Sequence, residues 1–169
     1  MSTHRIRPGK LSDLPRLVEI YNHYVTHAHF TFDTQEFSPD QRRTWFDAFS
    51  NSGPHQLLVA KVDGKLVGYA CSSRFKKKPA YSRSVETTIY MDVDFVGKGS
   101  GQDLYLSLLN ALREEGSVHR AYGGVALPND ESVALHERLG FSHVGIYHEV
   151  GFKLGRYWDV AWYEKDVSS

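Results

Sequence analysis

Hydrophobic and polar positions follow two different periods along the chain, and their order predicts a mixed α/β fold. Helical spacing appears at residues 11–25, where apolar side chains recur at positions 14, 17, 18, 20, 21, 24 and 25. Helices are also expected from Ser38 to about residue 51, from the glycine turn at 97–101 to residue 115, and at 129–139. Runs rich in β-forming residues predict strands at 4–8, 57–62, 66–73, 85–93, 120–127, 141–150 and 157–165.

Local signals place several boundaries of these elements. Ser38, Pro39 and Gln41 have the spacing of a helix start with a capping box. Asp63-Gly64 between two β-rich runs predicts a hairpin turn, and the glycines between residues 151 and 155 predict another. The order β-α-α-β-β-β-α-β-α-β-β fits an α/β (α+β) fold with one mixed, mostly antiparallel twisted sheet, flanked by about four helices on its two faces.

One segment combines a strand, a glycine-rich turn and a helix. Residues 85–93 lead into Gly97, Gly99 and Gly101, which precede the helical leucines at 104, 108, 109 and 112. Such a turn can point several backbone N–H groups and the positive end of a helix dipole at a phosphate. The glycine spacing differs from the dinucleotide fingerprint G-x-G-x-x-G, and the Gly-Lys-Ser/Thr ending of a Walker loop is missing. A tight connection without a ligand remains the alternative.

Composition and charge narrow the class of protein. The length of 169 residues predicts a single domain (1–169), and 41% hydrophobic residues suffice for its core. The 20 basic and 20 acidic residues balance, so no net charge favours nucleic acid or an anionic membrane. With no transmembrane-length apolar run, we expect a cytoplasmic protein. Cys71, the single cysteine, lies in a predicted strand and is expected to be a buried structural thiol.

Glu86 is the first candidate for chemistry, because it interrupts a strand whose neighbours Val85, Ile89 and Met91 are apolar. A carboxylate in such a position is either a general base or one half of a structural ion pair. Strand alternation would put Glu86, Thr88 and Tyr90 on one face. The histidines show no metal-ligand spacing, so no metal is expected.

Two segments resemble the GNAT superfamily of N-acetyltransferases. Gly99 and Gly101 match its pyrophosphate loop, although Val96 stands where glutamine or arginine is usual. The second half of the chain matches its pattern at Asn129, Ser132, Leu135, Gly140 and Phe141, with His136 at the usual tyrosine position.

The resemblance extends over about residues 5–165 to the phosphinothricin and methionine-sulfoximine acetyltransferase family. It rests on Asn22 to Tyr24, Phe32, Glu86, Thr88, Tyr90, Leu104 and Tyr105, Leu127 to Asp130, Leu135 to Glu137, Val150 to Lys153, and Trp158 to Val160. It implies transfer of acetyl from acetyl-CoA, as co-substrate, to the α-amino group of a small amino-acid-like acceptor.

The resemblance also implies roles for individual residues. Glu86 would act as the base, a backbone N–H near Met91 would bind the oxyanion, and His136 or Tyr105 would serve the leaving thiolate. Cofactor contacts would come from Ile89, Tyr90, Met91, Gly97, Lys98, Gly99, Ser100, Gly101, Gln102 and Asn129. Acceptor contacts would come from Phe32, Phe75, Lys76, Lys78, Tyr81, Val85 and Thr87. The family also suggests a homodimer that pairs across its C-terminal strands.

Several alternatives stay open at this level. Asn129 can simply cap a helix, Tyr105 and His136 can be structural, and Lys76 to Lys78 can be a solvated loop. The acceptor could instead be a protein N-terminus, a polyamine or an aminoglycoside. A non-catalytic module that binds acyl-CoA is a third possibility, and the glycine spacing disfavours a nucleotide-binding oxidoreductase.

Overall fold

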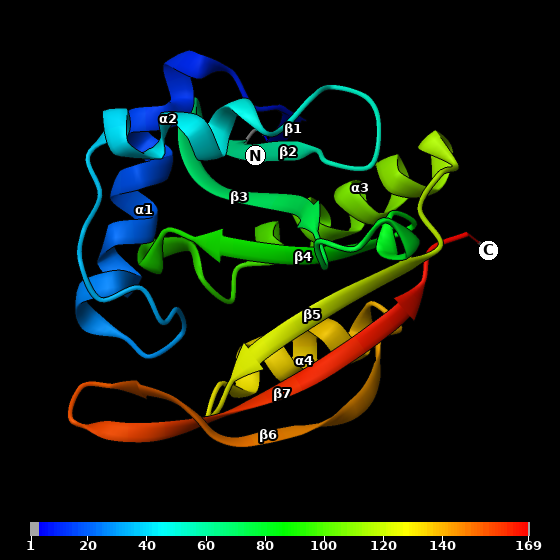
Figure 1. The fold of residues 1–169 in the computed structure, drawn as a ribbon. Coiled ribbons are helices and arrows are strands. Elements are labelled where there is room, and N and C mark those ends of the chain that lie inside the picture. Colours follow the sequence, from blue (N-terminus) through cyan, green and yellow to red (C-terminus); the bar gives the residue numbers. More distant parts are fainter. Residues whose placement is uncertain (1–3, 169) are drawn as a thin grey trace.

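A computed structural model describes residues 4–168, which form one sheet with helices on both faces (Figure 1). The helices are α1 (Leu14–His27), α2 (Pro39–Asp47), α3 (Ser100–Glu115) and α4 (Asp130–Arg138). The strands are β1 (His4–Pro8), β2 (Leu57–Val62), β3 (Lys65–Arg74), β4 (Ser84–Met91), β5 (Arg120–Ala126), β6 (Ser142–Lys153) and β7 (Arg156–Asp166). Their order along the chain confirms the predicted succession of elements.

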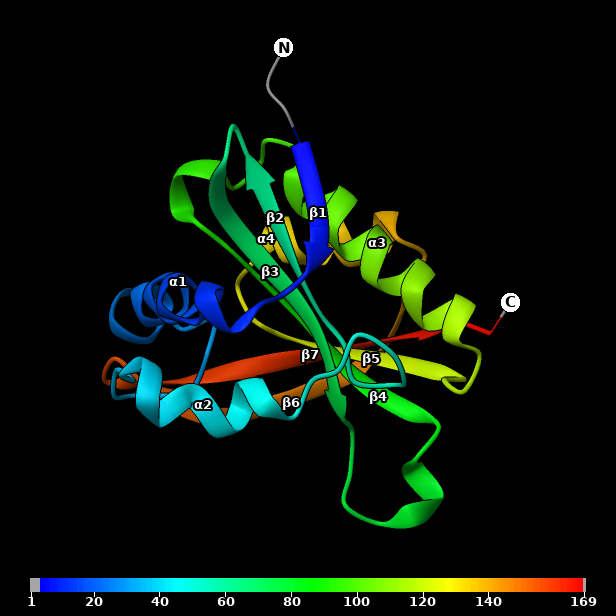
Figure 2. The ribbon, with the colours of Figure 1, turned by 90° about the horizontal axis from the view of Figure 1, so that it is seen from above.

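The seven strands lie in the order β1-β2-β3-β4-β5-β7-β6, and every neighbouring pair except one is antiparallel. The exception is β4 and β5, which run parallel and pair only at residues 84–86 and 120–122. Beyond this short contact the two strands separate, and Figure 1 shows the sheet dividing into two halves there. Figure 2 shows α1 and α2 on one face of the sheet and α3 on the other.

Two hydrophobic clusters hold the layers together. The larger lies between α3 and the sheet, and it includes the fully buried Tyr105, Leu108 and Leu112. The smaller joins α1 to β2 and β3, with Trp45 and Phe46 of α2 packed against it. Because burial of one large apolar side chain contributes about 1.5–3 kcal/mol, these clusters fix the positions of β4 and the helices around it.

Most predicted boundaries agree with the structure, including the capping box of α2. The Ser38 hydroxyl accepts a hydrogen bond from the Gln41 N–H, and the Gln41 side chain accepts one from the Ser38 N–H. At α1, however, the Asp13 carboxylate makes no cap and pairs with Arg7 at 2.7 Å. Asp13 therefore joins the start of α1 to β1 and does not cap the helix.

The turn of the last hairpin was predicted too early. It is formed by Leu154 and Gly155, which both have positive φ, whereas Gly151 remains within β6. An added Cβ on Gly151 would lie 2.3 Å from the ring of Phe32. This glycine therefore makes room for a packed aromatic ring, and not for a turn.

Candidate active site

A cavity of about 660 Å³ opens where β4 and β5 separate. Residues 87–91 of β4 line one wall and residues 124–126 of β5 line the other, while the glycine turn and α4 close its ends. Parallel strands that diverge leave backbone groups without partners, and a ligand in the gap can bond with them. The topology therefore creates a binding site at the junction of the two half-sheets.

The glycine turn lies at one end of this cavity and has the geometry of an anion site. Gly97 and Gly99 have φ values of +74° and +86°, which side chains with a Cβ rarely adopt. Gly99 precedes α3 and no side chain caps that helix. The N–H groups of residues 97–101 have no hydrogen-bond partner within the described chain. Together with the helix dipole, these free donors suit a phosphate or diphosphate.

The other residues predicted to bind the cofactor lie in and around this turn, and their side chains differ in exposure to solvent. Lys98 is exposed, and its ammonium lies 5.2 Å from the centre of the Phe95 ring. The Ser100 side chain is buried, whereas Gln102 is exposed and lines the cavity. Val96 also lines the cavity, so its apolar side chain faces the position that the resemblance assigns to a bound cofactor.

The edge of β4 presents main-chain groups to the cavity. The Asp92 N–H is bonded to Val67 of β3. Because N–H directions alternate along a strand, those of Ile89 and Met91 face the opposite side, toward the gap. Tyr90 pairs with β3 through its backbone and places its ring against Tyr21 on the other face of the sheet. Ile89 and Met91, more than Tyr90, can therefore pair with an extended ligand.

Glu86 lies where β4 and β5 begin to separate, opposite Tyr122. Its carboxylate is half-buried and has no hydrogen bond or ion pair with any residue from 4 to 168. Burial raises the pKa of the Glu86 carboxyl above its ordinary value. Because a structural pair would lower this pKa, the structure favours a carboxylate that can accept a proton.

A buried hydrogen-bond chain lies on the opposite face of β4 from Glu86. The Thr87 hydroxyl lies 2.6 Å from that of Tyr105, which lies 3.2 Å from Nε2 of His136. Nδ1 of His136 lies 2.7 Å from the carbonyl oxygen of Ser132 and must donate to it. Neutral His136 therefore accepts at Nε2, so Tyr105 donates to His136 and Thr87 donates to Tyr105.

Burial sets the charge state of this chain. Burial lowers the pKa of His136, and the hydrogen bond to Ser132 opposes that effect. Burial also raises the pKa of Tyr105, which is fully buried behind the cavity. Thr87 and His136 line the cavity. An added Cβ on Gly123 of β5 would lie 2.6 Å from Nε2 of His136, so this glycine allows the close approach of the ring.

Asn129 combines a capping position with a place in the cavity wall. Its side-chain oxygen accepts a hydrogen bond of 3.2 Å from the Ser132 N–H at the start of α4. The residue also lines the cavity. Its structural role as a helix cap is thus established, and its amide NH₂ remains the group available to a ligand.

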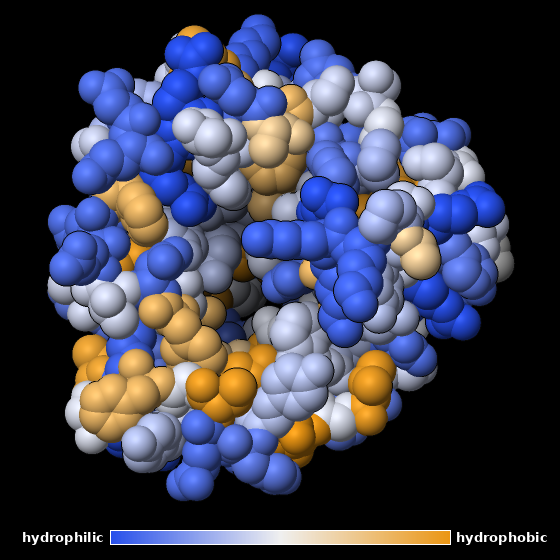
Figure 3. Space-filling view, viewed as in Figure 1, coloured by the Kyte–Doolittle hydropathy of each residue, from blue (hydrophilic) through white to orange (hydrophobic). Residues whose placement is uncertain are grey.

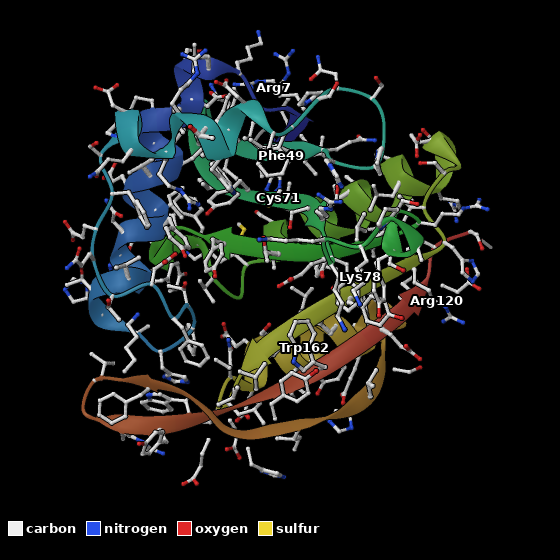
Figure 4. The ribbon with its side chains drawn as sticks, in the orientation of Figure 1. Arg7, Phe49, Cys71, Lys78, Arg120 and Trp162 are labelled. Atoms are coloured by element: carbon white, nitrogen blue, oxygen red, sulfur yellow. The ribbon has the colours of Figure 1, made fainter. Side chains whose placement is uncertain are left out.

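Glu86 shares its face of the sheet with the loop between β3 and β4. Phe75 of this loop stacks on Tyr122, with ring centroids 4.4 Å apart. The Lys76 ammonium lies 5.2 Å from the centre of the Phe75 ring and 5.1 Å from that of Tyr81. Lys78 is exposed. Figure 3 shows a hollow in the middle of this face, and the labelled Cys71, Lys78 and Trp162 lie around the same place in Figure 4.

Three predicted acceptor residues lie elsewhere. One is Thr87, which belongs to the buried chain on the face of β4 opposite Glu86. The Val85 side chain is fully buried in the core beneath α3, and the ring of Phe32 packs on Gly151 of β6. Phe30, which shares the loop after α1 with Phe32, lines the cavity instead. Their placement depends on the β6–β7 hairpin, which no local pattern in the sequence could reveal.

The loop that carries Phe30 is held by the hairpin. The buried ammonium of Lys153 donates hydrogen bonds to the carbonyl oxygens of Tyr24 at 3.1 Å and Thr31 at 2.8 Å. His29 stacks on Trp158 of β7 with ring centroids 3.9 Å apart. Figure 1 shows this hairpin running beneath the end of α1. The β6–β7 hairpin thus shapes one wall of the cavity from a distance.

Two further properties concern the described residues as a whole. Between residues 4 and 168, no three histidine, cysteine or acidic side chains are grouped so that they could hold a metal ion. None of the helices in this range is both long and apolar enough to cross a bilayer.

Comparison with known proteins identifies close relatives of this chain. The model of the acetyltransferase (GNAT) domain matches residues 6–162. Phosphinothricin N-acetyltransferase of Streptomyces coelicolor is 50% identical over 165 residues, which cover 96% of each chain. L-methionine sulfoximine/L-methionine sulfone acetyltransferase of Pseudomonas aeruginosa is 30% identical over 162 residues, covering 96% of this chain and 94% of the relative.

A solved structure shows the same fold with a ligand. The GNAT superfamily phosphinothricin acetyltransferase of Sinorhizobium meliloti, in complex with acetyl-CoA, superposes with a TM-score of 0.91 at 29% identity. The match covers 97% of this chain and 88% of that one.

Proposed function

The chain belongs to the GNAT acetyltransferase family and uses acetyl-CoA as co-substrate, and from this we propose that it acetylates the α-amino group of a small amino acid. The acceptor would be phosphinothricin, methionine sulfoximine, methionine sulfone or a related L-amino acid. One observation carries the proposal: the Glu86 carboxylate, with a raised pKa and no partner in the described chain, lies where β4 and β5 separate.

Glu86 would act as the general base. An α-amino group is largely protonated at neutral pH, so it must lose a proton before it can attack a thioester. Glu86 would accept that proton, directly or through water. The amine nitrogen then forms a bond to the acetyl carbon, and the Met91 N–H would donate to the oxygen of the tetrahedral intermediate. Collapse of this intermediate breaks the carbon–sulfur bond and releases a thiolate.

The hydrogen-bond chain at the cavity floor would serve the thiolate. Thr87 and His136 line the cavity, and the Tyr105 hydroxyl joins them. Tyr105 holds a proton that its raised pKa retains until a strong acceptor approaches. We assign stabilisation of the thiolate to this chain: Tyr105 would turn its hydroxyl from His136 to Thr87, so that the Thr87 hydroxyl can donate a hydrogen bond to the sulfur, which takes its proton from solvent.

Binding roles follow the walls of the cavity. The N–H groups of residues 97–101 would bind the diphosphate of acetyl-CoA, with Gln102 beside them. Ile89 and Met91 would pair with the amides of the pantetheine chain, and Asn129 would bond with the same chain through its free NH₂. Across the sheet, Phe75, Lys76, Lys78 and Tyr81 would contact the acceptor.

A thiol-release assay with acetyl-CoA tests the proposal. Phosphinothricin, methionine sulfoximine, methionine sulfone and free amino acids would be compared with a polyamine, an aminoglycoside and a peptide. We expect turnover with the small amino acids and an acetylated α-amine by mass spectrometry. Turnover only with the larger amines would assign a different acceptor, and no turnover with any amine would favour an acyl-CoA-binding module.

We further propose a homodimer that pairs through the C-terminal hairpin of a cytoplasmic enzyme. Exposed apolar side chains gather on the β6–β7 hairpin and its turn, including Tyr147, Val150, Phe152, Leu154 and Tyr157, each 56–60% exposed. Such a patch on a single chain indicates an interaction surface. Analytical ultracentrifugation should give twice the chain mass, whereas a monomer at micromolar concentration would contradict this assembly.

A further inference from the structure

Arg42 of α2 carries a charge that no residue in the described chain neutralises. Its guanidinium carbon lies 4.2 Å from the ring centre of Trp45, 4.6 Å from that of Tyr21 and 5.0 Å from that of Phe37. Its Nε is buried and has no hydrogen-bond partner within residues 4–168. Cation–π contacts offset part of the desolvation of the guanidinium, but buried N–H groups nearly always have an acceptor. The Arg42 guanidinium therefore lacks a hydrogen-bond acceptor, and a ligand could supply one.

The neighbouring residue shows what a paired arginine on the same helix looks like. Arg43 is exposed, and its Nε lies 2.8 and 3.0 Å from the two carboxylate oxygens of Asp47, one turn along α2. Arg42 points instead to the inner side of α2, where aromatic rings surround it. The different surroundings of Arg42 and Arg43 therefore follow from their positions on the helix, since both are arginines.

The rings beneath Arg42 rest on the strand that carries Glu86. Tyr21 contacts Tyr90, with ring centroids 5.0 Å apart. Tyr90 shares the face of β4 with Glu86 and lies four residues away, which is about 13 Å along a strand. The thiol of Cys71 on β3 interacts with the charges of both Arg42 and Glu86. Burial raises the pKa of this thiol to about 11, while the Arg42 charge lowers that pKa and the Glu86 charge raises it. Arg42 and Glu86 thus face the same region of the molecule.

We infer that Arg42 binds an oxyanion of the acceptor, a carboxylate or a phosphinate, while the acceptor's α-amine lies at Glu86. The planar guanidinium offers two parallel N–H groups to such an anion. This inference rests on the proposed function, because it requires an acceptor that is both an amine and an anion.

Steady-state kinetics of Arg42→Met, with Arg43→Met as the matched control, tests this role. Three acceptors separate the possible anions: phosphinothricin has a carboxylate and a phosphinate, methionine sulfone has only the carboxylate, and methionine sulfone amide has neither. Because hydrogen bonds to charged groups contribute about 1.5–3 kcal/mol, we expect Arg42→Met to raise the KM of an anionic acceptor by roughly 10- to 100-fold. The KM of acetyl-CoA and the kinetics with the amide should change little.

The pattern across acceptors identifies the anion. An effect on phosphinothricin and methionine sulfone alike assigns the carboxylate, and an effect on phosphinothricin alone assigns the phosphinate. Arg42→Lys keeps the charge and should fold even if Arg42→Met does not, with an intermediate rise in the KM of the anionic acceptor. Equal effects of Arg42→Met, or of Arg42→Lys, on anionic and amide acceptors would overturn the inference. The inference would also be overturned if Arg42→Met had the same KM for the anionic acceptor as Arg43→Met. Neither result would contradict the proposed function, because wild-type turnover would be unaffected.

Discussion

At the scale of single residues, the site combines a carboxylate that has no partner among residues 4–168 with a histidine that has two. Glu86 is half-buried with nothing in the described chain to neutralise it, and burial alone raises its pKa. His136 is held at both ring nitrogens, and its lowered pKa keeps it neutral. One group is thus ready to accept a proton on one face of β4, while the other orients a tyrosine hydroxyl on the opposite face.

The buried charge of Glu86 should lower the thermal stability of the protein in a pH-dependent way. Between the ordinary pKa of glutamate and its raised value in the folded protein, the folded state binds more protons than the unfolded state, so wild-type stability falls as the pH rises through this window. Glu86→Gln removes this penalty, and its Tm should exceed that of wild type at pH 7 but not below the window. Glu114→Gln, at an exposed position of α3, is the control. A Tm for Glu86→Gln that is lower at pH 7 would show that the carboxylate stabilises the fold.

Tyr105 allows a second test at this scale. Tyr105→Phe removes the hydroxyl between Thr87 and His136 but keeps the buried ring. If this hydroxyl serves the thiolate, kcat should fall by about 10²-fold, while the KM of acetyl-CoA changes little. Thr87→Val breaks the same chain at the cavity and should lower kcat similarly. An unchanged kcat in both variants would leave the chain a structural role only.

At the scale of elements, strand β4, the glycine turn and helix α3 work as one unit. The strand presents main-chain groups to the gap, and the turn gathers free N–H groups at the start of the helix. The β6–β7 hairpin contributes differently, since Lys153 holds the loop that carries Phe30. The proposed cofactor contacts therefore depend mainly on local chain geometry, whereas the shape of the proposed acceptor side depends on how distant elements pack.

Alanine variants of two glycines at the ends of α3 separate an effect on cofactor binding from an effect of backbone strain on stability. Gly99 and Gly116 flank this helix with φ values of +86° and +82°, and neither has a neighbour that an added Cβ would meet. Alanine at either site should cost about 1 kcal/mol of stability. Only Gly99→Ala brings a methyl group to the anion site, so it alone should raise the KM of acetyl-CoA, by about tenfold or more. An equal KM for both variants in steady-state kinetics would remove the glycine turn from the cofactor site.

At the scale of the whole molecule, the features that depend on local sequence patterns were predictable, whereas those that depend on packing between distant elements were not. The Ser38 capping box, the glycine turn and the strand alternation that places Glu86 all depend on residues close in sequence, and the structure agrees with them. The choice between Phe30 and Phe32 depends on Gly151, more than a hundred residues away.

The same limit explains the other differences. Arg42 faces the sheet because of the way α2 packs, and helical periodicity alone could not show that its Nε lacks a partner in the described part of the chain. The chain of Thr87, Tyr105 and His136 joins three elements that no spacing relates. The resemblance implies an acceptor contact for Val85, but strand alternation already puts this residue on the face opposite Glu86.

The most direct measurement is the rate of α-amine acetylation by Glu86→Gln at saturating acetyl-CoA and phosphinothricin, compared with wild type. The proposed mechanism predicts that kcat falls by about 10²- to 10⁴-fold, with the KM of acetyl-CoA unchanged because the cofactor contacts remain. It also predicts that wild-type kcat declines as the pH falls through the raised pKa of Glu86. A Glu86→Gln enzyme that retains wild-type kcat and the same pH profile would contradict the central claim.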